Sequence, residues 1–288
     1  MKSIVVYYFS GTGNTEIVAS MLRDGFSGLE CAVTLIRIED ILNGDRKVDP
    51  GEYDLVGIGC PVIGYGVPKI VRDFVRLLPK ANHKKTFIFR TAGGVAPVNY
   101  NASKSMIRKL AGKGYDVFHE RVFSISSNWI VKFDDAVIRQ LHEATGRKAA
   151  IMCREVVQGE NRILRTGIGL RVRMELMMHA FSGFFRLIGK DMVVDKACSD
   201  CGLCIKECPS RNIVRKNGKI RFNLSCNSCM RCVYSCPRSA IHFRFLSFFP
   251  VPGGYDIKKV LNPPHNADET ASGRIPPFFG EYIRNDSL

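Results

Sequence analysis

Eight of the eleven cysteines lie in one short segment whose pattern the chain repeats. Two runs share the spacing Cys-x2-Cys-x2-Cys-x3-Cys-Pro at an offset of 28 residues: Cys198, Cys201, Cys204, Cys208 and Pro209, then Cys226, Cys229, Cys232, Cys236 and Pro237. Three thiolates three residues apart can hold one face of a four-iron cubane, and the fourth ligand must come from elsewhere. The repeat therefore predicts two [4Fe-4S] sites of similar build.

In runs of this kind the last cysteine ligates the cluster of the other run. One cluster is expected on the first three cysteines of the first run and the last of the second: Cys198, Cys201, Cys204 and Cys236. The other is expected on the complementary set: Cys226, Cys229, Cys232 and Cys208. Because this crossed ligation makes the two sites nearly equivalent in sequence, it leaves open which of them faces any other redox centre.

Zinc and disulfides are the alternative uses of these cysteines. A zinc ribbon needs two Cys-x2-Cys pairs about 15 to 20 residues apart, which leaves the third cysteine and the proline of each run unexplained. The odd total of eleven disfavours complete disulfide pairing. The remaining cysteines, Cys31, Cys60 and Cys153, fall in apolar or helical contexts where a buried thiol is expected. No catalytic residue is assigned.

A second group of residues that could bind a ligand follows an apolar stretch and opens a helical pattern: Ser10, Gly11, Thr12, Gly13, Asn14 and Thr15. Glycines and hydroxyl residues let amides and hydroxyls surround a phosphate, and a helix N-terminus adds favourable partial charge. An ordinary N-cap uses the same residue types, but one cap does not need so many of them. A dinucleotide fingerprint would require glycine in place of Glu16, and the Gly-Lys-Ser/Thr of a P-loop is absent.

The elements around this loop predict an α/β fold built on a doubly wound, mostly parallel sheet. Strand candidates span residues 3–8, 31–37, 55–60, 86–91 and 117–125, and helical patterns span 14–27, 67–78 and 100–113. Strands that alternate with helices form parallel sheets covered on both faces. Ligands bind such sheets at the carboxyl ends of the strands, and the loop at 10–15 follows the first strand.

The sequence of this loop resembles the FMN-phosphate loop of flavodoxins, with Ser10, Thr12, Gly13 and Thr15 matching the family pattern. Two later segments look like the loops that contact the flavin ring in that family: Pro61, Val62, Ile63, Gly64 and Tyr65, then Thr91, Ala92, Gly93 and Gly94. The resemblance covers about residues 1–150. It implies a flavodoxin-like sheet that binds FMN.

One departure from the flavodoxins concerns the aromatic residues that commonly sandwich the ring. The loop after Thr91 has no aromatic residue until Tyr100. Tyr65 is a candidate for one face of the ring. The single tryptophan, Trp129, either stacks on the ring or packs beneath the rest of the chain.

The cysteine-rich segment resembles the bacterial ferredoxins with two four-iron clusters over about residues 191–245, which implies a small α+β domain. The whole chain looks like the flavodoxin-ferredoxin fusions of anaerobic prokaryotes. The expected division is a flavodoxin-like domain at 1–160, a basic helical connector at 161–190, the ferredoxin-like domain at 191–245 and a proline-rich tail at 246–288.

Three segments outside the two motifs have open interpretations. A helix is expected around residues 134–158, packed on the sheet. The connector is either an interdomain helix or a basic amphipathic helix that lies on a membrane or a partner. The tail either wraps the ferredoxin-like domain through Phe278, Phe279 and Tyr282 or lacks regular structure.

The formal net charge of +15 is concentrated in the second half of the chain. Residues 1–160 hold 22 Lys and Arg against 17 Asp and Glu, whereas residues 161–288 hold 20 against 10. Two oxidised clusters at about −2 each and a flavin phosphate reduce the total to roughly +9. This charge suits an acidic electron-transfer partner, and nothing in the pattern of basic and aromatic residues predicts nucleic-acid binding.

No stretch is apolar and long enough to predict a transmembrane helix, and the first residues do not resemble a signal peptide, so a cytoplasmic location is expected. Together the motifs predict electron transfer between two clusters and a bound FMN, with a redox partner protein or a small electron acceptor outside. Two alternatives stay open. One is an FMN-dependent reductase of a small acceptor such as a quinone, fed by the clusters. The other is a non-redox binding module in which the clusters are structural.

Overall fold

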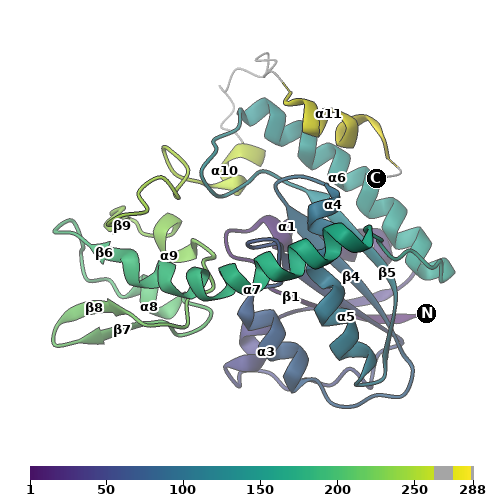
Figure 1. Cartoon of the computed structure of the whole chain (residues 1–288). Coiled ribbons are helices and arrows are strands. Elements are labelled where there is room, and N and C mark those ends of the chain that lie inside the picture. Colours follow the sequence, from purple (N-terminus) through teal and green to yellow (C-terminus); the bar gives the residue numbers. More distant parts are fainter. Residues whose placement is uncertain (263–274, 287–288) are drawn as a thin grey trace.

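The computed structural model describes residues 1–262 and 275–286, including the backbone but not the side chains of 179–182, 186 and 278 (Figure 1). Its larger part is a five-stranded sheet in which every neighbouring pair is parallel. The strands are β1 (Ser3–Tyr8), β2 (Ala32–Arg37), β3 (Leu55–Pro61), β4 (Lys84–Ala92) and β5 (Tyr115–Ser124). Their spatial order is β2-β1-β3-β4-β5. This is the strand order of flavodoxin-like doubly wound folds, so the predicted fold class is confirmed.

Helices cover both faces of the sheet, because its strands are apolar on both sides. On one face lie α1 (Asn14–Ser27) and α6 (Asp135–Gln158), whose apolar side chains pack on Ile4 and Val6 of β1. On the other face lie α2 (Ile38–Leu42), α3 (Lys69–Leu77) and α5 (Lys104–Ala111), which pack on Val5 and Tyr7. Adjacent residues of β1 thus point to opposite faces, as the strand geometry requires.

The helix expected over 100–113 is divided in the structure. A short helix α4 (Pro97–Tyr100) and a 3-10 turn η1 (Asn101–Ser103) precede α5. The tighter turn places the Ser103 hydroxyl where it donates to the buried carboxylate of Glu120 on β5, at 2.6 Å. The expected helix at 134–158 is present as α6.

The cysteine-rich segment folds as a small α+β domain in which the duplication is visible. Strand β6 (Met192–Val194) pairs antiparallel with β9 (Ile241–Phe243), and β7 (Ile213–Lys216) pairs with β8 (Lys219–Phe222). The single-turn helices α8 (Leu203–Lys206) and α9 (Arg231–Tyr234) lie 28 residues apart, the offset of the cysteine runs. The repeat in the sequence therefore corresponds to a repeated turn-helix unit.

The helix α7 (Ile168–Asp191) extends from the parallel sheet to the cysteine-rich domain across the outside of the molecule (Figure 1). Met174 is buried near its start, and Ile188 near its end belongs to the core of the cysteine-rich domain. Among the described residues, no helix has the length and apolarity needed to cross a membrane.

The tail packs in two places. Phe249 joins the core of the cysteine-rich domain, ahead of the short helix α10 (Ile257–Leu261). The last helix, α11 (Pro277–Arg284), instead packs Phe279 and Tyr282 on α6. The expectation that these two residues contact the ferredoxin-like domain is wrong. They pack instead on apolar residues of α6 that face away from the sheet, and so bury them. The side chain of Phe278 lies outside the described residues.

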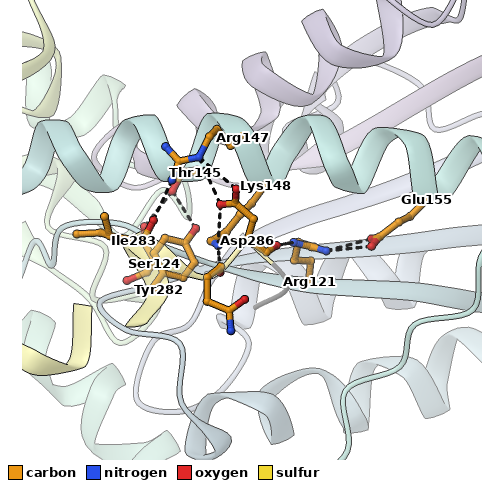
Figure 2. Close-up of polar contacts among 10 residues, drawn as sticks. Arg121, Ser124, Thr145, Arg147, Lys148, Glu155, Tyr282, Ile283 and Asp286 are labelled. Atoms are coloured by element: carbon orange, nitrogen blue, oxygen red, sulfur yellow. Dashed lines mark hydrogen bonds and ion pairs between the residues drawn. The ribbon is translucent and has the colours of Figure 1, made fainter. Parts of the chain in front are cut away.

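Polar contacts fasten the end of the chain to α6 and β5 (Figure 2). The Tyr282 hydroxyl lies 3.0 Å from that of Thr145, which donates to the Ser124 carbonyl at 3.1 Å. The fully buried Lys148 ammonium donates to the Asn285 carbonyl and lies 3.4 Å from the Asp286 carboxylate. The tail therefore neutralises a cation that α6 buries.

Candidate cofactor sites at the junction of the two domains

The residues of the predicted phosphate loop connect the end of β1 to the start of α1. Gly13 occupies the N-cap position with φ 99°, a left-handed conformation that suits glycine. Among the described residues, no side chain caps the first turn of α1. The Gly13 amide donates to Ser10 Oγ at 3.2 Å, which folds the loop back over the helix terminus. Amides, hydroxyls and a helix terminus thus converge at this loop, a donor set that fits a phosphate.

Side-chain hydrogen bonds fix the rest of the loop. The buried Thr15 hydroxyl lies 2.8 Å from that of Thr91, which links the phosphate loop to the end of β4. Thr12 Oγ1 accepts from the Asn128 amide at 2.9 Å. Asn14 donates to the Ser126 carbonyl at 2.8 Å. The loop is therefore held from the ends of two other strands.

Twelve of the fifteen predicted flavin-contacting residues line one cleft at the carboxyl edge of the sheet. They are Ser10, Gly11, Thr12, Asn14, Thr15, Pro61, Val62, Ile63, Gly64, Thr91, Ala92 and Gly93. The cleft lies at the carboxyl ends of the neighbouring strands β1 and β3, between which the strand order reverses, and doubly wound sheets bind ligands at this switch point. The structure therefore brings the three predicted loops together.

Three predicted residues do not line this cleft. Gly13 lies on the neighbouring cavity at the outer side of the loop. Gly94 turns its carbonyl toward the Asn99 amide at 2.7 Å. Tyr65 has φ 61° and is 41% exposed. Tyr65 lies outside the cleft lining, and its stacking on a flavin ring stays a prediction.

Trp129 is the aromatic residue that does line the cleft, and it also packs on the cysteine-rich domain. Its ring lies 5.5 Å from that of Phe185 and 5.1 Å from that of Phe249. Stacking of Trp129 on a flavin and packing of Trp129 against the rest of the chain are therefore compatible, since its side chain borders both the cleft and the cysteine-rich domain. Phe185 in turn lies against Gly64, where any Cβ would approach its ring to 1.9 Å.

The loop after β5 contributes lining residues that the sequence reasoning missed: Ile125, Ser126, Ser127 and Asn128. Their position after the fifth strand of a parallel sheet was the available signal. In addition, Tyr255 from the tail donates to Asn14 at 2.7 Å and thereby closes the outer side of the phosphate loop. Nothing in the local sequence around Tyr255 indicates this contact.

The electrostatic interactions among the cysteines of the two runs favour the two predicted crossed groups. Cys204 is influenced electrostatically by Cys198, Cys236 and Cys201. Cys226 is influenced by Cys229 and Cys208. Cys232 is influenced by Cys229, Cys226 and Cys208, and after these by Cys204 of the other predicted group. No three Cys, His, Asp or Glu side chains of the described residues are arranged around a single metal ion. A cubane distributes its thiolates over separate iron atoms, whereas one zinc ion gathers four ligands, so the donor set fits clusters.

Burial makes these thiols poor acids in the absence of iron. It raises the pKa of Cys226 to about 12, and it also raises the pKa of Cys204, with the neighbouring thiols adding to the effect. A buried thiolate needs a cationic neighbour. Iron supplies this positive charge, so the two groups of buried thiols are suited to bind iron-sulfur clusters.

The backbone around the two groups repeats at the same 28-residue offset. Asp200 and Ser228 have left-handed φ angles of 56° and 52°, and their amides donate to Cys198 and Cys226 at 3.4 and 3.3 Å. The last cysteine of each run accepts a similar bond: Asn212 to Cys208 at 3.2 Å and Ala240 to Cys236 at 3.3 Å. Such bonds to sulfur help to set cluster potentials.

The two groups differ in their surroundings, which the sequence did not reveal. Cys229 is buried and lines the cleft that the three predicted loops form, whereas its counterpart Cys201 is exposed. A Cβ at Gly11 would lie 2.6 Å from the Cys229 carbonyl oxygen and 2.9 Å from its Cβ. We call the group Cys208, Cys226, Cys229 and Cys232 the proximal cluster site. The group Cys198, Cys201, Cys204 and Cys236 is the distal cluster site.

Arg231 joins the proximal cluster site to the phosphate loop. Its guanidinium donates to the carbonyls of Ser10 at 2.5 Å and Gly11 at 3.1 Å, and pairs with Glu39 at 2.7 Å. It also donates to the Glu207 carbonyl at 3.1 Å, next to the cluster cysteine Cys208. The first repeat has leucine at the equivalent position, 203. This difference between the repeats was the signal that could have distinguished the two sites.

Comparison with known proteins agrees with the division of the chain. Residues 197–241 match the family model of a 4Fe-4S dicluster domain. A putative electron transport protein, YccM of Escherichia coli (strain K12), is 50% identical over 42 residues, which are 15% of this chain and 12% of that protein. The cysteine-rich domain is thus a 4Fe-4S dicluster domain, and the chain carries two [4Fe-4S] clusters.

The N-terminal half is similar to flavodoxin of Megasphaera elsdenii, with 32% identity over 93 residues, 31% of this chain and 65% of that protein. The solved structure of the two-electron reduced form of that flavodoxin has a TM-score of 0.36 at 22% identity, covering 51% of this chain and 98% of that one. The chain spans less than two thirds of either curated relative. The assignment of the fold rests on the strand order of the sheet.

Proposed function

We propose that this fusion of a flavodoxin-like domain with a 4Fe-4S dicluster domain is an electron-transfer protein in which FMN and two clusters form one internal relay. When bound, FMN exchanges one or two electrons and each cluster exchanges one. The contact between Cys229 and Gly11 is the observation that supports this proposal most strongly. It brings a cluster ligand to the edge of the cleft that the flavodoxin-like loops form.

In this proposal the loops divide the binding of FMN. Residues 10–15 hold its phosphate, and residues 61–64 and 91–93 border its ring together with Trp129. Thr91 links the phosphate loop to the loop that borders the ring. Its hydroxyl contacts that of Thr15, and its strand, β4, ends within residues 91–93. The cleft fits this role because its polar donors gather at the helix terminus, and its apolar residues Val62 and Ile63 lie on the other side.

Arg231 is proposed to fix the distance and orientation between the proximal cluster site and the cleft. It contacts the phosphate loop and the neighbour of Cys208, and its own helix carries Cys232. The side chains of Arg231 and Glu39 are both mostly buried, so each charge loses hydration free energy. The ion pair between them offsets much of this cost. A rigid junction keeps electron transfer inside one chain rather than between chains.

The distal cluster site is the proposed contact for the external redox partner. Cys201 is exposed there. Residues 191–245 contain ten Lys and Arg against four Asp and Glu. Two oxidised clusters subtract about four charges, so a positive excess remains. We therefore propose that the partner at this end is an acidic electron carrier, drawn in by complementary charge.

A second candidate function is reduction of a small anionic acceptor. A groove of about 410 Å³ shares Ile63 and Gly64 with the flavin-binding cleft and is also lined by Lys69, Arg108 and Lys109. Its basic lining and its position beside the ring loop favour this activity over docking of a protein. Oxidation of the reduced chain by a small anionic quinone, without a protein carrier, would support it.

Anaerobic purification followed by a potentiometric titration tests the relay. The proposal expects about eight iron atoms and one FMN per chain, with flavin and cluster absorbance changes that are reversible. Bound zinc with little iron, or a chain that rejects FMN after reconstitution, would contradict it. Clusters that cannot be reduced reversibly would instead support the structural interpretation.

A further inference from the structure

Helix α7 exposes a row of large apolar side chains along its outer face. Ile168, Val172, Leu176 and Leu187 are 81%, 51%, 67% and 56% exposed. The first three are spaced by four residues, and Leu187 follows after eleven, three helical turns later. They therefore form one stripe, which we call the α7 stripe. Large apolar patches of this kind mark an interaction surface rather than an ordinary protein surface.

The stripe extends along both domains of the molecule. Residues 168–191 form a helix about 36 Å long, which crosses from the parallel sheet to the cysteine-rich domain (Figure 1). At its C-terminal end the Asp191 carboxylate accepts from the amide of Phe245, at 3.0 Å. Phe245 is itself 79% exposed. A further exposed apolar residue of the cysteine-rich domain is thus anchored at the C-terminal end of α7.

Basic residues border the stripe. Arg171 and Arg173 are exposed and lie on opposite sides of it on the helical wheel. Arg165 precedes the helix and Lys190 lies in its last turn, and both are exposed. The one carboxylate of the helix before Asp191 is Glu175, which is already paired with Arg171 at 3.4 Å and with Arg108 at 3.5 Å. The border is therefore strongly cationic.

This arrangement discriminates between possible occupants. A second copy of α7 packed on the stripe would bring two arginine-rich borders together, which opposes association. An anionic lipid surface satisfies both features, because its headgroups pair with arginines while an apolar stripe enters the headgroup-acyl boundary. A helix whose exposed apolar stripe is bordered by basic residues is suited to lie in a membrane surface.

We propose that α7 binds the surface of an anionic membrane, with the α7 stripe inserted at the boundary and the flanking arginines at the headgroups. Both redox domains are then held at the membrane surface, since α7 contacts each of them. This proposal does not depend on the proposed electron transfer, because it concerns where the protein is held.

Cosedimentation of the full chain, with its clusters, tests the proposal against two kinds of vesicle: phosphatidylcholine alone and phosphatidylcholine with phosphatidylglycerol. The wild-type chain is expected to bind the second kind and to be released by salt. Val172→Asp combined with Leu176→Asp should lower the partition coefficient at least about tenfold. Leu77→Asp is the matched control, because Leu77 is 50% exposed on α3 and lies away from the stripe. Unchanged cluster absorbance establishes that each variant is folded.

The outcomes separate lipid from protein occupants. Equal binding of the stripe variant and the wild-type chain, or equal binding to neutral and anionic vesicles, would overturn the proposal. So would failure to bind any vesicle. Conversion of a wild-type dimer to a monomer by the stripe substitutions, measured by light scattering, would identify the stripe as an interface between copies and would also overturn it.

Discussion

Arg231 distinguishes two halves of a repeat that otherwise share their cysteines, turns and sulfur hydrogen bonds. Its guanidinium satisfies three backbone carbonyls and one carboxylate from three separate segments. A cation with so many partners at a domain junction is a positioning residue, because its removal leaves these acceptors without their donor. The proximal cluster site therefore depends on a residue that is not a ligand.

Replacing Arg231 by methionine should destabilise the chain by about 3 kcal/mol or more, because Glu39 is left buried without its partner. Arg215→Met is the control, since Arg215 pairs with Asp200 at the surface. Such exposed pairs contribute about 0 to 1 kcal/mol. Thermal unfolding followed by cluster absorbance measures both. Equal losses for the two variants would show that Arg231 has no special role at the junction.

Gly11→Ala tests the contact between the domains from the other side. An added Cβ would lie 2.6 Å from the Cys229 backbone oxygen, so the phosphate loop or the cluster loop must move. The dissociation constant of FMN should rise by about tenfold or more, since a loop displaced by a fraction of an ångström loses its aligned donors. Flavin fluorescence titration gives this constant.

Gly28→Ala is the control for Gly11→Ala. Gly28 has a φ of −65°, and its nearest atom to an added Cβ lies at 3.5 Å. Its FMN affinity should stay unchanged. Unaltered FMN affinity in Gly11→Ala would contradict the tight junction described above.

His119 on β5 introduces a pH dependence. It is fully buried and lies 2.8 Å from Glu155. Burial lowers its pKa from the usual 6.5, against the opposing effect of Glu155. The unfolded chain therefore binds a proton more readily, and stability is lost as the pH falls below about 6.5. The midpoint temperature of thermal unfolding should decrease as the pH is lowered from about 7.5 to about 5.5. His119→Gln should make this dependence of the midpoint on pH less steep. Identical pH dependences of the midpoint in the wild-type chain and His119→Gln would refute this role. Any effect of acid on the clusters is common to both chains and cancels in the comparison.

The two cofactor motifs can be recognised in the sequence because each motif is local. The cysteine spacing and the hydroxyl-rich loop at 10–15 encode their chemistry over a few residues. Asn128 and Tyr255 could not be found in this way. Their contacts with Thr12 and Asn14 join segments more than a hundred residues apart. Tyr65 does not line the cleft and has a left-handed φ of 61°, a backbone angle that its local sequence does not predict.

At the scale of elements, the alternation of strands and helices was sufficient to predict the parallel sheet. The boundaries of β1 were predicted without error, whereas β4 and β5 begin two residues earlier than expected. Their first residues pair with each other at the edge of the sheet, including Lys84 with Tyr115. Register between strands decides such ends, and register is not visible in one strand's pattern.

The tail shows how burial elsewhere decides the position of an element. Apolar residues alone did not indicate whether Phe279 and Tyr282 would pack on the first or the second domain. Helix α6 settles the choice, because Val137, Leu141 and Ala144 form a second apolar stripe. The buried Lys148 adds a requirement for acceptors that residues 285 and 286 provide (Figure 2).

Phe279→Ala should therefore destabilise the flavodoxin-like domain by about 3 to 5 kcal/mol, the usual cost of removing a fully buried aromatic ring. Phe248→Ala is a suitable control, since Phe248 is 58% exposed. Denaturant unfolding followed by flavin release gives the two values. A small effect of Phe279→Ala on flavin release would mean that α11 is only loosely attached to α6.

For the whole molecule, the junction between the two domains determines which cluster site lies next to the cleft. Cys229 borders the proposed flavin cleft, Arg231 binds the predicted phosphate loop, and Cys201 is exposed. The near-equivalence of the two cluster sites in sequence is thus removed by packing. The relay that we propose runs from a partner through the distal and proximal cluster sites to the flavin, or in reverse.

The kinetics of internal electron transfer test this relay most directly. A pulse of reductant that delivers one electron per chain, followed by the flavin and cluster absorbances at several protein concentrations, separates transfer within a chain from transfer between chains. The account predicts a first-order exchange between clusters and flavin whose rate constant does not change with protein concentration and falls in Arg231→Met. An exchange rate that increases in proportion to protein concentration, or no exchange at all, would contradict it.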